Sequence, residues 1–444
     1  MIDQVTAPYL SVVAVSRNDD HGGDPLRRTQ VFINSLAWQA QRYALATELV
    51  LVDWNPPEGR AGLAEALEFP VNAYFCARVI VVPPAVHAGF RHGDRLPLFQ
   101  MIGKNVGIRR AHGEFVLATN IDILLDDALF EALACRELDP KRMYRADRFD
   151  VANTLPDEGH EARQAFCRNK DNLIRRNQRQ HPEAYRSMQD KDGYASSGLL
   201  RTDLARKLPW AELDRSLTVP CVRTAQNVPL EYLHTNGCGD FTLLHRNAWA
   251  ELHGYGEFET FSMHIDSIGC IQAQVAGYRE TCFLPPLVCY HIEHAPASGW
   301  TPEGGRTLFE RIREAGIPLF EWEVVKVTLI SMMDNEVFFV LNDDHWGLRD
   351  IELEEKAFGG AIQEKVIIEG TRPSRFMRLA AIKQQYEHGI LFQNFFAQDI
   401  ETGYVYLRRL TAHPLWRLVH LGIVICYSIR KGLNLVMPRL YSKK

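Results

Sequence analysis

The 444-residue chain lacks the features that would place it in several common functional classes. Its nine cysteines are scattered with no CxxC spacing, which gives no support to a zinc ribbon or a thioredoxin-like redox motif. Its formal net charge is −5, whereas a nucleic-acid-binding domain usually carries a basic excess, so nucleic acid is not an expected partner. The sequence also contains no internal repeat.

Long hydrophobic runs are missing as well. The opening residues, MIDQVTAPYL, have neither the basic region nor the apolar core of a signal peptide, and we expect a reducing, cytoplasmic setting. The longest uninterrupted apolar run in the tail is 421–427, far short of the roughly 20 residues that span a bilayer. Basic residues border this run, so the tail 411–444 is predicted to be a basic amphipathic segment. It either lies in a membrane interface, as a peripheral contact at the inner face, or packs as a helix on the protein body.

Apolar strand patterns and helical patterns alternate in the first third of the chain. A helix is predicted at 27–45 and another at 100–112. Continuous apolar strands between helices predict an α/β fold with a mostly parallel sheet that has helices on both faces. The expected strands are LSVVAV (10–15), ELVLV (48–52), RVIVV (78–82) and EFVLA (114–118).

Polar, turn-rich segments follow three of these strands, at 16–24, 53–60 and 119–122. Ligands bind beyond the carboxyl ends of parallel strands, so we expect the three loops to meet at one edge of the sheet. The alternative is that each is simply a polar surface loop.

The pattern weakens over 155–192, which is predicted to be an insertion or lid. Order returns at 235–294, where a helix capped by Ser262 and running to residue 276 is expected before strands at 279–284 and 287–290. Residues 296–410 form a mixed, largely helical extension of accessory character. At about 150 residues per domain, two or three domains are expected.

A few polar residues in this frame could carry chemistry. Asp122, in ATNIDILL, is a candidate carboxylate ligand for a hard divalent cation, although Asn120 to Asp122 could instead form a turn or cap a helix beginning near Asp126. Asp266 is a candidate general base or a helix-stabilising acid in a first turn. His291 and His294 are either ligands or structural histidines.

The sequence resembles the GT-A nucleotide-sugar glycosyltransferases, most closely the family 2 group, over roughly residues 8–295. A GT-A domain is therefore expected over 1–295. The most specific piece is KNVGIRRAHGEFVLATNID, which is similar to the helix and strand that deliver the DxD motif of that family. The other matching pieces are LSVVAVSRNDD, ELVLVDWNPP, GDFTLLHRNAWAELHGYGE, HIDSIGCIQAQVAGY and CYHIEH.

The resemblance implies roles for individual residues. Asp122 would bind Mn²⁺ or Mg²⁺ with His294, or with His291 in its place. Asn120 stands where the family has its first aspartate and would contact the donor. Asp266 would be the general base, although the acid that usually precedes it is absent, because the sequence here is His264-Ile265-Asp266. Nucleotide contacts are implied for Ser16, Arg17, Asn18, Asp53, Asn55, Lys104, Asn105 and Arg109, with Lys104 or Arg109 on the diphosphate.

The expected activity is inverting, metal-dependent transfer of a sugar from a nucleoside-diphosphate sugar to a glycan or lipid-linked glycan acceptor. Two alternatives stay open at this point. A nucleotidyltransferase acting on sugar phosphates would release pyrophosphate, and a non-catalytic sugar-binding protein of the same fold would release no nucleoside diphosphate.

Overall fold

The computed structural model describes residues 8–19, 22–177, 221–222, 234–283, 285–294, 305–320, 337–338 and 340–360. The chain divides into two units, Met1–Ala381 and Ile382–Lys444, and every described residue belongs to the first. The tail 411–444 and much of the region predicted as accessory therefore lie outside the described residues.

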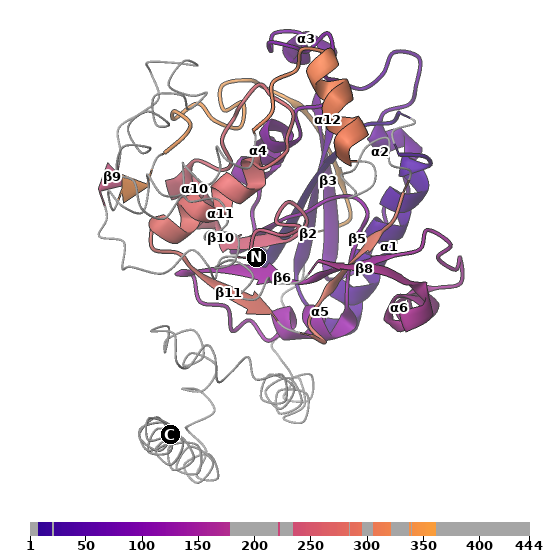
Figure 1. The fold of residues 1–444 in the computed structure, drawn as a ribbon. Coiled ribbons are helices and arrows are strands. Elements are labelled where there is room, and N and C mark those ends of the chain that lie inside the picture. Colours follow the sequence, from indigo (N-terminus) through magenta and orange to yellow (C-terminus); the bar gives the residue numbers. More distant parts are fainter. Residues whose placement is uncertain are drawn as a thin grey trace, which may run out of the picture. The chain divides into compact units, whose positions relative to one another are not determined.

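An eight-stranded sheet forms the centre of the first unit (Figure 1). The fourth strand in the spatial order given below is parallel to its neighbour on one side and antiparallel to its neighbour on the other. Four neighbouring pairs are parallel and three are antiparallel, so the predicted mostly parallel α/β sheet is confirmed. In spatial order the strands are β11 (Arg279–Phe283), β6 (Arg142–Ala146), β10 (Thr242–His245), β4 (Phe115–Ala118), β1 (Leu10–Ser16), β2 (Thr47–Trp54), β3 (Phe75–Val82) and β14 (Glu354–Phe358).

Two smaller sheets complete the strands of the described residues. The first contains β5 (Ile123–Leu125), β12 (Cys289–Ile292), β7 (Arg148–Val151) and β8 (Leu173–Asn177), in that spatial order. The second pairs β9 (Cys221–Val222) with β13 (Val337–Phe338).

Helices cover both faces of the main sheet. Figure 1 shows one long helix, α1 (Pro25–Tyr43), on one side of the strands, and three others on the opposite side: α4 (Gln100–Arg110), α10 (Arg246–Leu252) and α11 (Ile265–Val275). The remaining described helices are α2 (Leu63–Ala66), α3 (Pro84–His87), α5 (Asp127–Ala134), α6 (His160–Arg168), the 3₁₀ helix η1 (Lys170–Asn172) and α12 (Gly305–Glu314).

Alternation along the central strands explains why most of their residues are apolar. Val13 and Val15 of β1 pack into the core on the α4 side, whereas Val12 and Ala14 pack into the core on the α1 side. Both faces of a covered parallel sheet are buried, so both sets of positions are mostly apolar.

The loops after β1, β2 and β4 meet at one edge, as predicted. Ser16 is the register partner of Asp53 between β1 and β2, and Val13 is the register partner of Ala118 between β1 and β4. The segments 16–24, 53–60 and 119–122 therefore leave the sheet side by side.

Two expectations about single elements need correction. Ser262 does not cap α11, because the cap position is His264 and the Ser262 hydroxyl instead donates to Gln100 Oε1 at 3.0 Å. The first part of 155–192 contains α6, η1 and β8, and residues 178–192 lie outside the described residues, so the insertion or lid stays a prediction. The last predicted strand begins later than expected, at Cys289.

The segment 340–360 packs on the main sheet. Arg109 and Arg110 donate to the carbonyl oxygens of Trp346 and Gly347, and Trp346 is buried. The segment then continues as β14, the antiparallel edge strand beside β3. A boundary at residue 295 stays a prediction, but the strand at 354–358 belongs to the sheet that holds the site.

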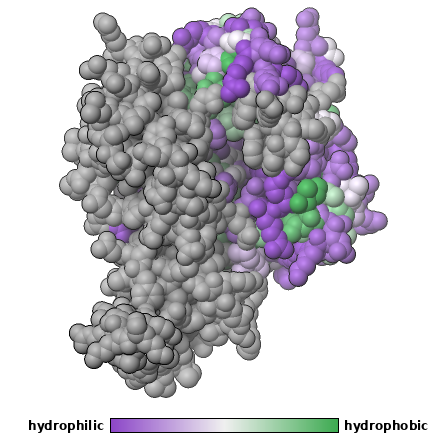
Figure 2. Space-filling model, in the orientation of Figure 1, coloured by the Kyte–Doolittle hydropathy of each residue, from purple (hydrophilic) through white to green (hydrophobic). Residues whose placement is uncertain are grey.

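The described surface carries few apolar side chains. On the face that Figure 2 presents, it is mainly hydrophilic, with a small hydrophobic area. The large hydrophobic side chains exposed among the described residues are Val71, Ile174 and Ile351. Within the described ranges, no helix has the length and apolar character needed to cross a membrane.

Candidate active site

Asp122 lies just beyond the carboxyl end of β4, immediately before β5. It does not cap a helix, because the cap of α5 is Asp126, whose Oδ1 accepts from the backbone N–H of Ala128 at 2.8 Å. The Asp122 side chain is only 9% exposed. A carboxylate this buried needs partners of opposite charge.

Those partners are two histidines from β12 and the residues directly after it. Asp122 Oδ2 lies 3.3 Å from His294 Nε2 and 3.8 Å from His291 Nε2. One ligand atom from each residue lies within 4.8 Å of the other two. One carboxylate and two imidazoles suit Mn²⁺, Fe²⁺ or Zn²⁺, so the donor set fits a divalent cation.

The charges around Asp122 favour its ionised form. Burial alone would raise the pKa of Asp122, but His291, His294 and Arg28 hold that pKa well below its usual range. Burial would lower the pKa of His291, yet Asp122 and Asp150 raise it on balance. The structure thus holds an anionic ligand beside two imidazoles, and a divalent cation binds imidazole in its neutral form.

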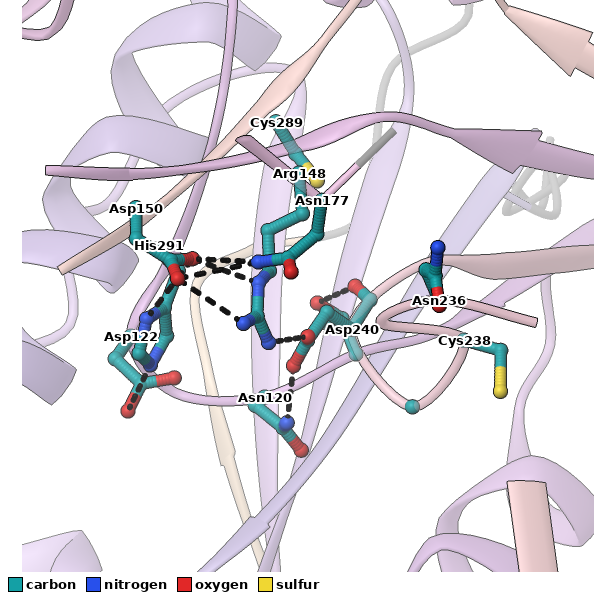
Figure 3. Close-up of polar contacts among 12 residues, drawn as sticks. Asn120, Asp122, Arg148, Asp150, Asn177, Asn236, Cys238, Asp240, Cys289 and His291 are labelled. Atoms are coloured by element: carbon teal, nitrogen blue, oxygen red, sulfur yellow. Dashed lines mark hydrogen bonds and ion pairs between the residues drawn. The ribbon is translucent and has the colours of Figure 1, made fainter. Parts of the chain in front are cut away.

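Asn120 points away from this group and into a neighbouring set of polar contacts. Its Oδ1 accepts from Gln100 Nε2 at 2.8 Å, and its Nδ2 donates to Asp240 Oδ1 at 2.5 Å. Asp240 also pairs with Arg148, which reaches Asp150. Figure 3 shows these side chains as a continuous series that ends at His291 and Asp122.

Asp53 offers an unused acceptor at the end of β2. One carboxylate oxygen, Oδ2, accepts from the backbone N–H of Leu63 at 2.8 Å. The other, Oδ1, is buried and has no hydrogen-bond partner among the described residues. Burial raises the pKa of Asp53 to about 6, opposed by the Leu63 hydrogen bond. A ligand N–H or O–H would satisfy this oxygen.

The rest of the predicted nucleotide loop is tied to its neighbours. Arg17 and Asn55 both donate to the carbonyl oxygen of Pro97, at 3.2 and 3.1 Å. Asn18 donates to the carbonyl oxygen of Ala61 at 2.8 Å, and Ser16 is buried. These contacts join the loops after β1 and β2 to the segment before α4.

Lys104 and Asp266 both lie beside Gly239, in the segment that leads into β10. Lys104 Nζ is fully buried and donates to the carbonyl oxygen of Gly239 at 2.6 Å. Burial lowers the pKa of Lys104 to about 8, opposed by Asp240 and Asp266. Asp266 is so close to Gly239 that a Cβ there would lie 2.9 Å from its Oδ2.

Two predicted donor contacts do not reach this cluster. Asn105 is occupied by Tyr255, donating to its carbonyl oxygen and accepting from its backbone N–H. Arg109 donates to the carbonyl oxygen of Trp346, and its guanidinium lies 4.7 Å from the ring centroid of that tryptophan. Because α4 runs antiparallel to the strands, only its first turns approach the carboxyl edge.

Sequence reasoning missed several residues of the site. Arg28 on α1 has its Nε 3.8 Å from Asp122 Oδ2, and it follows the β1 loop closely enough for its position to have suggested this. Asp240, Arg148 and Asp150 carried no comparable local signal. They come together only when β7 and β10 take their places in the two sheets.

Comparisons with known proteins find distant structural likenesses. No family model and no curated protein sequence matches the chain. The crystal structure of S. aureus TarS 1-349 has a TM-score of 0.34 and 12% identity, covering 73% of this chain and 71% of that one. The same TarS segment in complex with UDP has a TM-score of 0.32 and 13% identity, covering 73% and 70%. Activity depends on the side chains of the site rather than on likenesses of this strength.

Proposed function

We propose that this protein is a metal-dependent glycosyltransferase that uses a nucleoside-diphosphate sugar as its donor. The observation that carries the proposal is the group Asp122, His291 and His294, which lies at the edge of the sheet where β1 and β2 also end. A cation bound there would supply positive charge to the diphosphate. The rest of the chemistry is assigned to the side chains around it.

Donor binding is assigned to two kinds of group. Asp53 Oδ1 is the acceptor for an N–H of the base or an O–H of the ribose, because it is buried and lacks a partner among the described residues. Arg28 supplies positive charge next to Asp122, where its guanidinium is held by the carbonyl oxygens of Gly22 and Gly23. A diphosphate lying beside Asp122 would meet this guanidinium.

Proton transfer is assigned to Asp266. It would accept the proton of the acceptor hydroxyl as that oxygen attacks the anomeric carbon, with inversion of configuration and release of the nucleoside diphosphate. Lys104, which is itself buried, places a cationic group near Asp266 and Asp240. The acceptor is proposed to be a glycan or lipid-linked glycan.

The test is turnover of a panel of nucleoside-diphosphate sugars with Mn²⁺, read as release of nucleoside diphosphate. Asp266→Asn is expected to keep nucleotide affinity but to lose about 10²–10⁴ in rate, the usual contribution of a general base. Asp139→Asn is the matched control, because Asp139 lies in the turn before β6, at the opposite edge of the sheet, and its Oδ1 accepts from Lys141 N.

Full turnover by Asp266→Asn would reject the base assignment. Pyrophosphate release from a nucleoside triphosphate and a sugar phosphate would instead identify a nucleotidyltransferase. Binding of nucleotide sugar with no nucleoside diphosphate released by the unaltered protein would identify a binding protein.

A further inference from the structure

The register of the four-stranded sheet places Asp150 directly beside His291. These two residues are Cα partners in the parallel pairing of β7 with β12. Register partners project from the same face of a sheet. On the opposite face their neighbours Phe149 and Tyr290 form an edge-to-face ring pair with centroids 6.4 Å apart. The Asp150–His291 contact is therefore set by backbone pairing.

The two ring nitrogens of His291 face two different carboxylates, as Figure 3 shows. Nε2 lies 3.8 Å from Asp122 Oδ2, and Nδ1 lies 3.5 Å from Asp150 Oδ1. A neutral histidine carries one ring proton, and the hydrogen bond at one nitrogen decides which nitrogen keeps its lone pair. Nδ1 is buried and has no hydrogen bond of standard geometry among the described residues, so the Asp150 carboxylate at 3.5 Å acts on it through its charge, which favours a proton at Nδ1.

The Asp150 carboxylate has three further partners besides His291. Arg148 Nε lies 2.8 Å from its Oδ1, while Arg175 and Asn177 donate to its Oδ2 at 3.3 and 3.1 Å. Arg175 is the register partner of Asp150 in β8, and Asn177 is the partner of Arg148. The carboxylate is fully buried, and three donors from two strands, β7 and β8, hold it in position.

We propose that Asp150 is a positioning residue for the cation site, holding the Nδ1–H form of His291 so that the Nε2 lone pair faces the cation beside Asp122. This inference rests on the metal part of the proposed function and not on sugar transfer. Carboxylate–histidine–metal arrangements of this kind fix the ring and increase the basicity of the ligating nitrogen.

The competing arrangement is a second ion held by Asp150, His291 and Glu293, whose ligand atoms also lie within 4.8 Å of one another. The charge around Asp150 disfavours it. Two guanidinium groups already lie within 3.3 Å of the Asp150 carboxylate, and a further divalent cation would be repelled by both. The two arrangements predict different effects for Glu293.

The test uses Mn²⁺ alone, without nucleotide, titrated into the full chain and followed by electron paramagnetic resonance. Asp150→Asn is expected to weaken Mn²⁺ binding about 10–100-fold with one ion bound before and after the change. Glu293→Gln is expected to bind as the unaltered protein does. A folded Asp150→Asn with unchanged affinity, an equal loss in Glu293→Gln, or two ions in the unaltered protein would each overturn the proposal.

Asp150→Asn leaves two buried guanidinium groups with less charge compensation, so a second measurement uses the unaltered protein. With ¹⁵N-labelled histidine and ¹¹³Cd²⁺, the nitrogen of His291 coupled to cadmium is expected to be Nε2, with the proton retained on Nδ1. Cadmium coupling at Nδ1, or no cation binding at all, would overturn the proposal. Absence of sugar transfer with both results intact would reject the activity alone.

Discussion

Asn120 occupies a position where a carboxylate would meet another carboxylate. Its amide nitrogen lies 2.5 Å from Asp240 Oδ1, and its amide oxygen accepts from Gln100. An amide satisfies both neighbours because it is donor and acceptor at once. The carboxylate of this pair lies at residue 240, on the loop before β10.

The pairing of Asn120 with Asp240 can be tested by exchanging the amide and the carboxylate between the two positions. Asn120→Asp places two carboxylates within hydrogen-bond distance in a part-buried site, and we expect a loss of about 1–3 kcal/mol in the free energy of unfolding. Adding Asp240→Asn restores a donor between the two positions but removes the charge opposite Arg148, so the double variant should lose less than the sum of the two single variants. Urea unfolding of both single variants and the double variant measures the coupling, and simple additivity would contradict the pairing.

For single residues, the site residues that directly follow strands could be predicted from the sequence. Those brought to the site by the pairing of distant strands could not. Asp122 and His291 stand in or next to strongly apolar runs, so their positions at strand ends could be predicted. Asp150 could not, because its role depends on the register between β7 and β12, in which it pairs with His291, 141 residues later in the sequence. No local pattern encodes such a register.

Among the elements, α4 depends on two glycines to approach the sheet. An added Cβ at Gly107 would lie 2.5 Å from Val13 Cγ1, and one at Gly103 would lie 2.6 Å from Val15 Cγ2. The close approach brings the first turn of α4, with Gln100 and Lys104, to the site.

Gly107→Ala is therefore expected to destabilise the protein despite the better helix propensity of alanine. Alanine favours a helix by about 1 kcal/mol over glycine, whereas forcing extra volume into a packed core costs about 1–3 kcal/mol. Gly360→Ala is the control, since a Cβ there meets nothing within 4 Å. Thermal unfolding should show a lower midpoint for Gly107→Ala alone, and an unchanged or higher midpoint would contradict the packing.

Elements with long apolar patterns were predictable, and short or half-exposed ones were not. β1, β2 and β3 are continuous apolar runs and were located to within three residues at each end. β14 is almost wholly exposed and has the sequence EEKAF, so nothing in its composition indicates a strand. Its place is fixed by pairing with β3 after Arg109 and Arg110 hold the preceding turn.

On the scale of the whole molecule, the site unites parts of the chain that are far apart in sequence. Asp53, Asp122, Asp240, Asp266 and His294 all lie at or near the carboxyl edge of the central strands. This agrees with the rule that open parallel sheets bind ligands at that edge. The tail 411–444 lies outside the described residues, and its contact with a membrane surface stays a prediction.

The central claim is that the group around Asp122 holds a divalent cation that binds a nucleoside diphosphate. The most direct measurement is calorimetry of UDP and GDP binding with Mn²⁺ and with chelator, for the unaltered protein and for Asp122→Ala. We predict binding of at least one nucleotide that requires Mn²⁺ and is lost in folded Asp122→Ala. Binding of equal strength with chelator, or in Asp122→Ala, would contradict the account.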